Sequence, residues 1–367
     1  MEYSPAGGRR FLRNSGQTGL AESAIARRPE REIQSDYIEL LEKVRAAGLL
    51  KPRYGAYGTL IAANAALYLL TWGAFVLLGD SWWQIVTAVI LAISFTQTAF
   101  LAHDASHSQI LVSRSANRRI GIVHANLAIG ICYGWWAPNH FRHHAYPNHE
   151  QRDPDLTNKF MLMTRSQAGS HDTVRYLPRR VQAFAFLPLL SFQAVSMHIK
   201  SALAIPGFKP RGRTSEAVLL FMHFLAYSGM LIVVLSPWKV LVFFAVQQGL
   251  FGIYLGCVFA INHKGMPTYD NDDMDFVRRQ VVCSRNIRGG RLVSLATGGL
   301  NYQIEHHLFP RMPRSNFRLV RPLVQDFCRS KDIPYTEVGV LGSFGQVMLY
   351  LHRLGKIRRP HDAYGIR

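Results

Sequence analysis

Four long stretches without a charged side chain constrain the fold of this chain more than any other feature. They cover residues 54–79, 81–102, 217–238 and 240–261. Each exceeds the ~20 apolar residues that an α-helix needs to cross the hydrocarbon layer of a bilayer. The stretches come in two pairs, and only a short turn separates the members of a pair. The sequence therefore predicts two transmembrane hairpins rather than the buried helices of a large soluble protein.

The distribution of basic residues predicts the orientation of these hairpins. Lys and Arg are frequent before residue 54 and between the hairpins, whereas the two short turns contain only Lys239. By the positive-inside rule, both termini and the central segment are then cytoplasmic. The formal net charge of +19 is explained by attraction to an anionic inner leaflet. Because the basic residues flank the spans and form no single stripe, they do not indicate nucleic-acid binding.

Two weaker apolar stretches, residues 120–138 and 181–199, need a different interpretation. If the first crossed the bilayer alone, it would carry the histidines at 140–144 to the face opposite those at 103–107. We therefore expect residues 120–138 to form a re-entrant or interface-lying segment packed against the spans. The second contains Pro188 and two glutamines, and we expect it to be an amphipathic helix on the membrane surface.

The predicted organisation is an all-α, polytopic membrane protein with a cytoplasmic helical cap. We expect residues 1–53 to be a cytoplasmic tail ending in an amphipathic helix at 32–47. The membrane domain covers 54–345, with the cap formed by 103–216 and 262–345, and 346–367 form a basic tail. No run typical of a signal peptide occurs before residue 54. The four cysteines form no CxxC pair, so neither a disulfide framework nor a cysteine-held metal cluster is indicated.

Histidines gather in clusters at the predicted cytoplasmic ends of the spans. The motifs HDASH (103–107), HFRHH (140–144) and QIEHH (303–307) place side chains at i, i+3 or i+4, on one face of a helix. One further histidine directly follows the fourth span. Together these positions supply eight candidate metal ligands: His103, His107, His140, His143, His144, His263, His306 and His307. A tetrahedral site would use about half of them, whereas two metals would use them all.

Other polar residues near these clusters are candidates for orienting the ligands. Asp104, Asp153 and Asp155 can accept the second N–H of an imidazole, although a helix-side acid and a loop turn explain them as well. Asn262 can contact a metal through water or cap the end of its span. The remaining histidines stand alone and are expected to be surface or hydrogen-bonded core residues: His124, His149, His171, His198, His223, His352 and His361.

The histidine motifs resemble those of a known protein family. HDASH, HFRHH and QIEHHLFP, in this order and on this framework of spans, resemble the three histidine boxes of the membrane fatty-acid desaturases. The segments HHAYPNHEQRDPDL and GLNYQIEHHLFPRMP are similar to the branch that includes front-end and linoleoyl-CoA-type desaturases. The resemblance extends from about residue 54 to the C-terminus. Gln303 stands where many acyl desaturases have histidine, and glutamine there is characteristic of front-end enzymes.

The resemblance implies a non-haem di-iron centre that uses dioxygen to introduce a double bond into an acyl lipid or acyl-CoA. It also implies His263 as an additional ligand after the last span. Some front-end desaturases carry a fused haem-binding donor domain, for which residues 1–53 are too few, so we expect a separate electron-donor reductase. An amide oxygen is a poor ligand beside imidazoles, so we expect Gln303 to orient a ligand by hydrogen bonding.

Other functions remain open at the level of the sequence. The same scaffold supports lipid hydroxylation or ketolation, in which oxygen is inserted instead of a second hydrogen being removed. A membrane zinc-dependent lipid hydrolase also uses histidines and aspartates, but it needs fewer of them. A non-catalytic membrane receptor or metal store is the least favoured alternative. The acyl carrier is open between coenzyme A, a carrier protein and a phospholipid.

Overall fold

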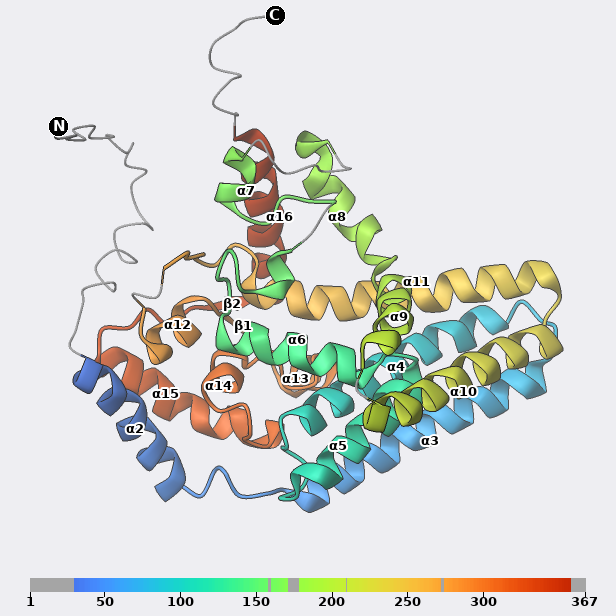
Figure 1. The fold of residues 1–367 in the computed structure, drawn as a ribbon, viewed down its shortest axis with the longest axis horizontal. Helices are drawn as coiled ribbons and strands as arrows, with labels where there is room; N and C mark the ends of the chain where they lie inside the picture. The colour runs from blue at the N-terminus through green and yellow to red at the C-terminus, as the bar shows by residue number, and fades with distance from the viewer. Residues whose placement is uncertain (1–29, 158–159, 171–177, 209, 272–273, 358–367) are drawn as a thin grey trace, which may run out of the picture.

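The computed structural model is built almost entirely of helices (Figure 1). It describes residues 30–157, 160–170, 178–208, 210–271 and 274–357. The predicted tails at 1–29 and 358–367 lie outside these residues. In chain order the elements are α2 (Glu30–Ala46), α3 (Tyr54–Leu78), α4 (Gln84–Ser106), α5 (Arg114–Ile122), η1 (Val123–Ala128), α6 (Tyr133–Ala145), η2 (Pro154–Leu156), α7 (Arg165–Gly169), η3 (Arg179–Val181), α8 (Gln182–Leu190), α9 (Gln193–Ala204), η4 (Ile205–Gly207), α10 (Pro210–Val234), α11 (Pro237–His263), α12 (Phe276–Val282), β1 (Asn286–Arg288), α13 (Arg291–Ala296), α14 (Gln303–Leu308), η5 (Arg314–Asn316), α15 (Phe317–Ser330), β2 (Glu337–Gly339) and α16 (Val340–Lys356).

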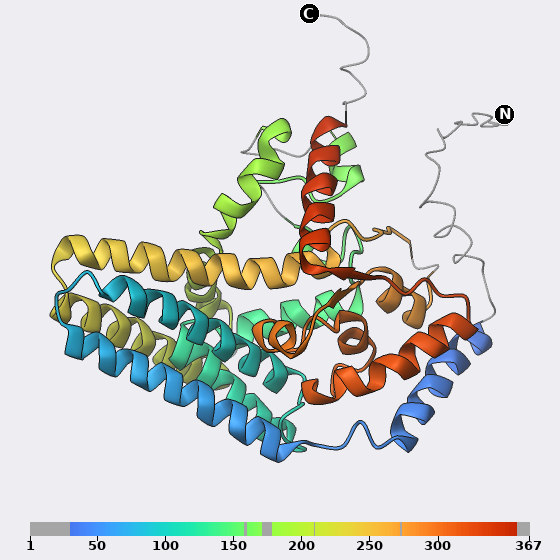
Figure 2. The same cartoon turned by 180° about the vertical axis from the view of Figure 1, so that it is seen from behind.

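Four of these helices, α3, α4, α10 and α11, are long and apolar enough to cross a membrane, as predicted. They lie side by side as two hairpins in both views (Figures 1 and 2). The hairpin turns are bonded to each other, because Ser236 N donates to Asp80 Oδ1 at 3.0 Å and Lys239 Nζ to the Asp80 carbonyl at 2.7 Å. At the other end of the bundle, α4 and α11 extend beyond the predicted spans. Their last turns therefore carry histidines.

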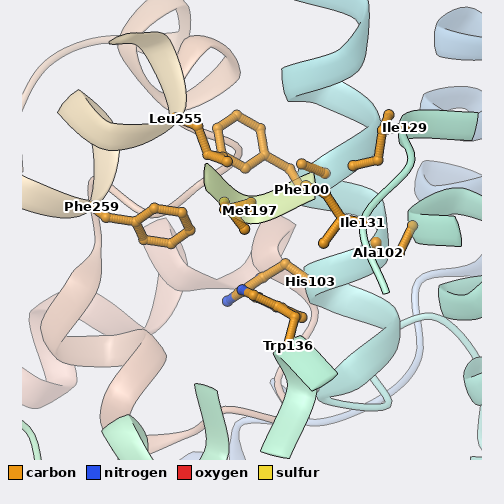
Figure 3. A pocket seen from close by; sticks show the side chains of 11 residues that line it. Phe100, Ala102, His103, Ile129, Ile131, Trp136, Met197, Leu255 and Phe259 are labelled. Carbon is orange, nitrogen blue, oxygen red and sulfur yellow. The ribbon is translucent and has the colours of Figure 1, made fainter. Parts of the chain in front are cut away.

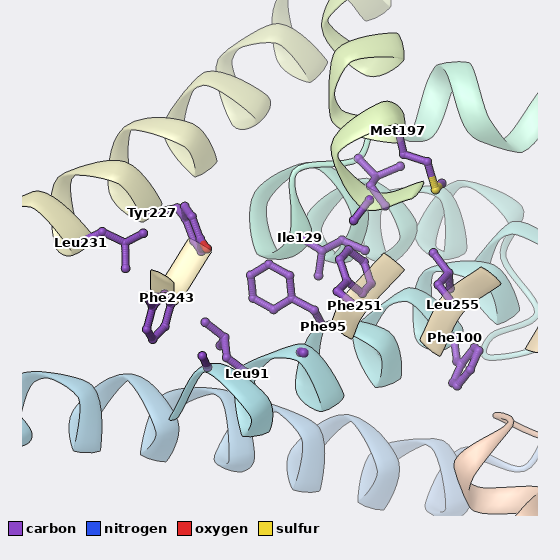
Figure 4. Close-up of a cluster of buried hydrophobic side chains, with 14 of the residues drawn as sticks. Leu91, Phe95, Phe100, Ile129, Met197, Tyr227, Leu231, Phe243, Phe251 and Leu255 are labelled. Atoms are coloured by element: carbon purple, nitrogen blue, oxygen red, sulfur yellow. The ribbon is translucent and has the colours of Figure 1, made fainter. Parts of the chain in front are cut away.

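The inside and the outside of this bundle are both apolar. Phe95 of α4 and Phe251 of α11 are fully buried and meet edge to face, with their ring centroids 5.6 Å apart (Figure 4). On the outside, Leu77 of α3 is 89% exposed and Val233 of α10 is 85% exposed. A surface with so many large apolar side chains is unfavourable in water and suits contact with lipid.

Two apolar segments beside the bundle are bent. The α5–η1 helix and α6 meet at 117°, so residues 120–138 are not one straight span, and the predicted re-entrant or interface-lying segment stays a prediction. The single helix predicted at 181–199 is wrong, because α8 and α9 meet there at 73°. The break follows Leu190, whose carbonyl would lie 2.5 Å from a Cβ atom at Gly252 of α11. The chain thus changes direction where its backbone touches a span.

The cap has a hydrophobic core of its own. Leu40 and Val44 of α2 are completely buried there with side chains from α12, α14 and α15, so the predicted helix at 32–47 is confirmed. Two features were not predicted. Strands β1 and β2 pair in parallel, with Ile287 opposite Val338. Helix α16 also continues through residues 346–356, which the sequence analysis placed in a basic tail.

Candidate metal centre

The structure brings all eight predicted histidines together at the junction of bundle and cap. They come from the end of α4, from α6, from the last residue of α11 and from α14. Their ring nitrogens form two groups, and within each group the nitrogens lie within 4.8 Å of one another. The five-histidine group comprises His103, His107, His140, His144 and His306. The three-histidine group comprises His143, His263 and His307.

The ring nitrogens of the five-histidine group are spaced as ligands of one ion would be. Nε2 of His103 lies 3.1 Å from Nε2 of His306, and Nε2 of His140 lies 2.9 Å from Nε2 of His107 and 3.1 Å from that of His144. Two nitrogens that each lie about 2.1 Å from a metal and form a right angle at it are about 3 Å apart. The distances therefore match a shared metal position.

Each ring of the three-histidine group is oriented by a partner on its outer side. Nδ1 of His143 contacts both carboxylate oxygens of Asp153 at 3.1 Å, that of His263 donates to the Cys283 carbonyl at 3.0 Å, and that of His307 donates to Gln280 Oε1 at 2.8 Å. Because these partners accept hydrogen bonds, Nδ1 carries the hydrogen and Nε2 keeps its lone pair. Nε2 of His143 and Nε2 of His263 lie 3.3 Å apart, and donation of Nδ1–H to an outer acceptor is usual for metal-bound histidines.

Of the other predicted carboxylates, Asp104 is the more deeply embedded. Its Oδ1 lies 3.1 Å from Nδ1 of His103, and its Oδ2 accepts from Tyr57 at 3.0 Å and pairs with Arg314 at 3.2 Å. Asp155 approaches Nδ1 of His143 at 3.5 Å with a half-exposed side chain. Asp104 and Asp153 therefore lie where the sequence predicted, while Asp155 contributes at longer range.

Gln303 lies beside the three-histidine group. Asn262 Nδ2 donates to Gln303 Oε1 at 3.1 Å, so the amide nitrogen of Gln303 faces Nε2 of His263 at 2.9 Å. The amide therefore contacts the nitrogen of His263 that would bind a metal, while the outer nitrogen bonds to the Cys283 carbonyl, and the expected orienting role of Gln303 stays a prediction. Asn262 also donates to the carbonyls of Val258 and Leu300, which fixes the end of α11.

The residues present fit two metal ions. Nε2 of His307, the ring nitrogen opposite its bond to Gln280, is buried and has no hydrogen-bond partner among the described residues. Burial, and then the neighbouring imidazoles, hold the pKa of His107, His306 and His307 well below its ordinary value. These rings are neutral at pH 7, as metal ligands must be. Buried lone pairs without donors are costly unless an ion binds them.

An apolar pocket meets the five-histidine group at His103. In Figure 3, His103 and Trp136 lie at one end of the pocket, and Phe100, Leu255 and Ile129 lie at the other. The pocket is lined by side chains of α4, η1, α6, α9, α11 and the turn between η1 and α6. An unbranched hydrocarbon chain fits such a lining, because it needs no polar partner.

The remaining described histidines do not join either group. His198, His223 and His124 bond to backbone carbonyls through Nδ1, as expected for satisfied core residues. His149 is buried against Tyr269, and His352 lies on α16. The other two, His171 and His361, lie outside the described residues.

Comparison with known proteins decides the family. Residues 80–339, which include all eight histidines, match the family model described as fatty acid desaturase. The chain belongs to the fatty acid desaturase family. The resemblance seen in the sequence is thereby confirmed.

Named relatives of this desaturase-family chain come from several kingdoms. It is 31% identical to an "Acyl-lipid (9-3)-desaturase" of Physcomitrium patens over 76% of this chain and 55% of that protein. It is 29% identical to a "Delta 8-(E)-sphingolipid desaturase" of Komagataella phaffii over 87% of this chain and 62% of that protein. It is 27% identical to "Fatty acid desaturase 3" of Bos taurus over 89% of this chain and 74% of that protein. The chain thus spans little more than half the length of the moss relative.

Proposed function

We propose that this chain is a membrane-bound acyl-lipid or acyl-CoA desaturase that uses dioxygen and electrons from a separate donor. One observation carries the proposal: eight histidines lie together in two groups, and the larger group meets the end of an apolar pocket at His103, in a member of the fatty acid desaturase family. The names of the relatives support an acyl substrate. Glutamine at position 303 supports the front-end branch.

The proposed reaction needs an external reductant, because dioxygen accepts more electrons than the acyl chain supplies. Two hydrogens leave adjacent methylene groups of the acyl chain, and a carbon–carbon double bond forms. Dioxygen accepts these two hydrogens, together with two electrons and two protons from the donor side, and is reduced to two water molecules. The electrons come from a reductase of the flavin or iron–sulfur class, for which the basic residues around the cap provide a docking face.

Two iron ions, bound by the eight histidines, would supply the reduction of dioxygen and the power to oxidise an unactivated C–H bond. Neutral imidazole donors suit iron among the first-row metals. Asp104 and Asp153 hold the rings of His103 and His143 by accepting from Nδ1. The apolar pocket positions a methylene group beside His103 and keeps water from it.

In the proposed topology, both termini, the cap and the metal centre are cytoplasmic. The four spans and the bent α5–α6 segment support this, because an even number of crossings returns the chain to one face. The proposed domains are 1–53, 54–345 and 346–367, although the last boundary falls within α16. Tags at Met1 and Arg367 should both be protected from protease in sealed cells and exposed in permeabilised ones. Cleavage of the C-terminal tag in sealed cells would contradict this topology.

The function is tested by metal content and product together. The purified protein should bind about two irons per chain, as eight imidazole donors allow. Cells that express it should accumulate acyl chains lacking two hydrogens, with the double bond located by mass spectrometry. A gain of one oxygen atom would instead identify a hydroxylase or ketolase. One zinc per chain, with turnover in the absence of dioxygen, would identify a hydrolase and refute the proposal.

A further inference from the structure

The turn between η1 and α6 interrupts a helix deep among the spans, where water is scarce. Its backbone carbonyls need other partners there, because an unpaired carbonyl in an apolar environment costs several kcal/mol. Three side chains from three different helices supply them. Tyr68 of α3 donates to the Ala128 carbonyl at 3.1 Å. The other two donors are histidines that the metal centre does not use.

His198 of α9 and His223 of α10 hold this turn from two sides. Nδ1 of His198 donates to the Gly130 carbonyl at 2.8 Å, and Nδ1 of His223 donates to the Leu127 carbonyl at 2.9 Å. Both rings are buried and lie nearly parallel, with an interplanar angle of 24°. Gly130 has a φ of +69°, and a Cβ atom there would lie 2.4 Å from the His223 ring. The turn can therefore keep this position only with glycine between the two rings.

The same turn forms part of the wall of the apolar pocket. Ile129 and Ile131, on either side of Gly130, both line it, as does Met197, which directly precedes His198. Ile129 lies at the end away from His103 (Figure 3). Its other side faces the bundle core near Phe95 and Phe251 (Figure 4). Any movement of the turn therefore changes how far the pocket extends from the metal centre.

We propose that His198 and His223 are positioning residues that fix this wall and thereby select the carbon atoms at which the acyl chain is desaturated. The inference rests on the proposed function. Neither ring belongs to a metal group, and the two act on the turn through different carbonyls, His198 through that of Gly130 and His223 through that of Leu127. A misplacement of about 1 Å at a reacting centre costs on the order of 10²-fold in rate. A wall that is free to move would therefore let neighbouring carbons compete.

The test compares double-bond positions in the acyl products of whole cells that express full-length variants. His198→Phe and His223→Phe keep a buried ring but remove the donor, whereas His198→Asn and His223→Asn keep an amide N–H near the former Nδ1. We expect the phenylalanine variants to raise the share of displaced isomers on the order of tenfold, the effect of losing about 1.4 kcal/mol of discrimination. The asparagine variants should restore the wild-type position. The matched control is His124→Phe, because the His124 ring bonds to the Ile120 carbonyl one turn earlier along the chain.

Each outcome bears on the inference. Phenylalanine variants that accumulate in the membrane with wild-type iron content and make one product at the wild-type position would overturn it. If they do not accumulate, Ile129→Ala tests the same wall with the histidines intact, and an unshifted product would overturn the inference as well. If wild-type cells make no unsaturated product, the proposed function fails and the inference falls with it. If the wild-type protein desaturates acyl chains but no variant shifts the position of the double bond, the inference is refuted and the proposed function stands.

Discussion

The two histidine groups differ in how their rings are held. In the three-histidine group, Asp153, the Cys283 carbonyl and Gln280 each fix one ring from outside. In the five-histidine group, Asp104 fixes His103, but Nδ1 of His144 and of His306 has no hydrogen-bond partner among the described residues. Rings pack on one another in both groups, as His107 does on His144 with centroids 4.4 Å apart and His143 on His263 with centroids 4.7 Å apart.

From this difference we infer that the five-histidine group would hold a metal through the number of its nitrogen donors, and the three-histidine group through the fixed orientation of its rings. A group of five retains four nitrogens when one is lost. A group of three retains two, which is fewer than the three or more protein ligands of ordinary histidine sites. The smaller group also has Gln303 beside it and fewer protein donors around its centre. The comparison predicts unequal responses to equivalent mutations.

The largest effect is expected from removing one imidazole of either group. His107→Ala, His143→Ala and His306→Ala should each abolish product while the protein still inserts, because the proposed reaction needs both metal positions. Iron content should separate the groups: His143→Ala should fall to about one iron per chain, whereas His107→Ala should retain more. His352→Ala, on α16 and outside both groups, is the control. Full activity in a stably expressed His143→Ala variant would refute the assignment of these histidines as ligands.

The next largest effect is expected at Gln303. Gln303→Ala removes the amide beside Nε2 of His263 and should lower activity by ~10–100-fold, as loss of a residue that orients a ligand usually does. Gln303→His should not exceed wild type, because a bulkier ring would displace His263. Product formed per unit of membrane protein measures both. Wild-type turnover in Gln303→Ala would make this residue a bystander and weaken the front-end assignment.

A smaller and qualitatively different effect distinguishes the two aspartates. Asp153→Asn should lower iron content and activity by about tenfold, because His143 loses its charged acceptor. Asp104→Asn should mainly lower the amount of folded protein, because it leaves the buried guanidinium of Arg314 without its carboxylate. Thermal aggregation in detergent, measured beside iron content, separates the two. Equal loss of stability in both variants would remove the distinction between the groups.

The spans and the ligand candidates were predictable from the sequence because both depend on short-range patterns. Uncharged runs define α3, α4, α10 and α11, and i, i+3, i+4 spacing defines the histidine motifs. Partners such as Gln280, Tyr57 and Arg314 were missed, because their contacts join elements that no spacing relates. The break between α8 and α9 was missed for a similar reason, since it depends on Gly252 of a distant helix. Even so, His198 and His223 were correctly set aside from the metal centre as lone histidines.

The separation of the histidines along the chain has a consequence for biogenesis. His103 and His306 lie 203 positions apart, yet their rings are in contact. During synthesis, both hairpins have left the ribosome before the segment that carries His306 and His307. The hairpins must therefore insert while the earlier histidines have no complete ligand set. We expect iron to be acquired last, so that cells starved of iron accumulate an inserted precursor whose cap is open to proteases.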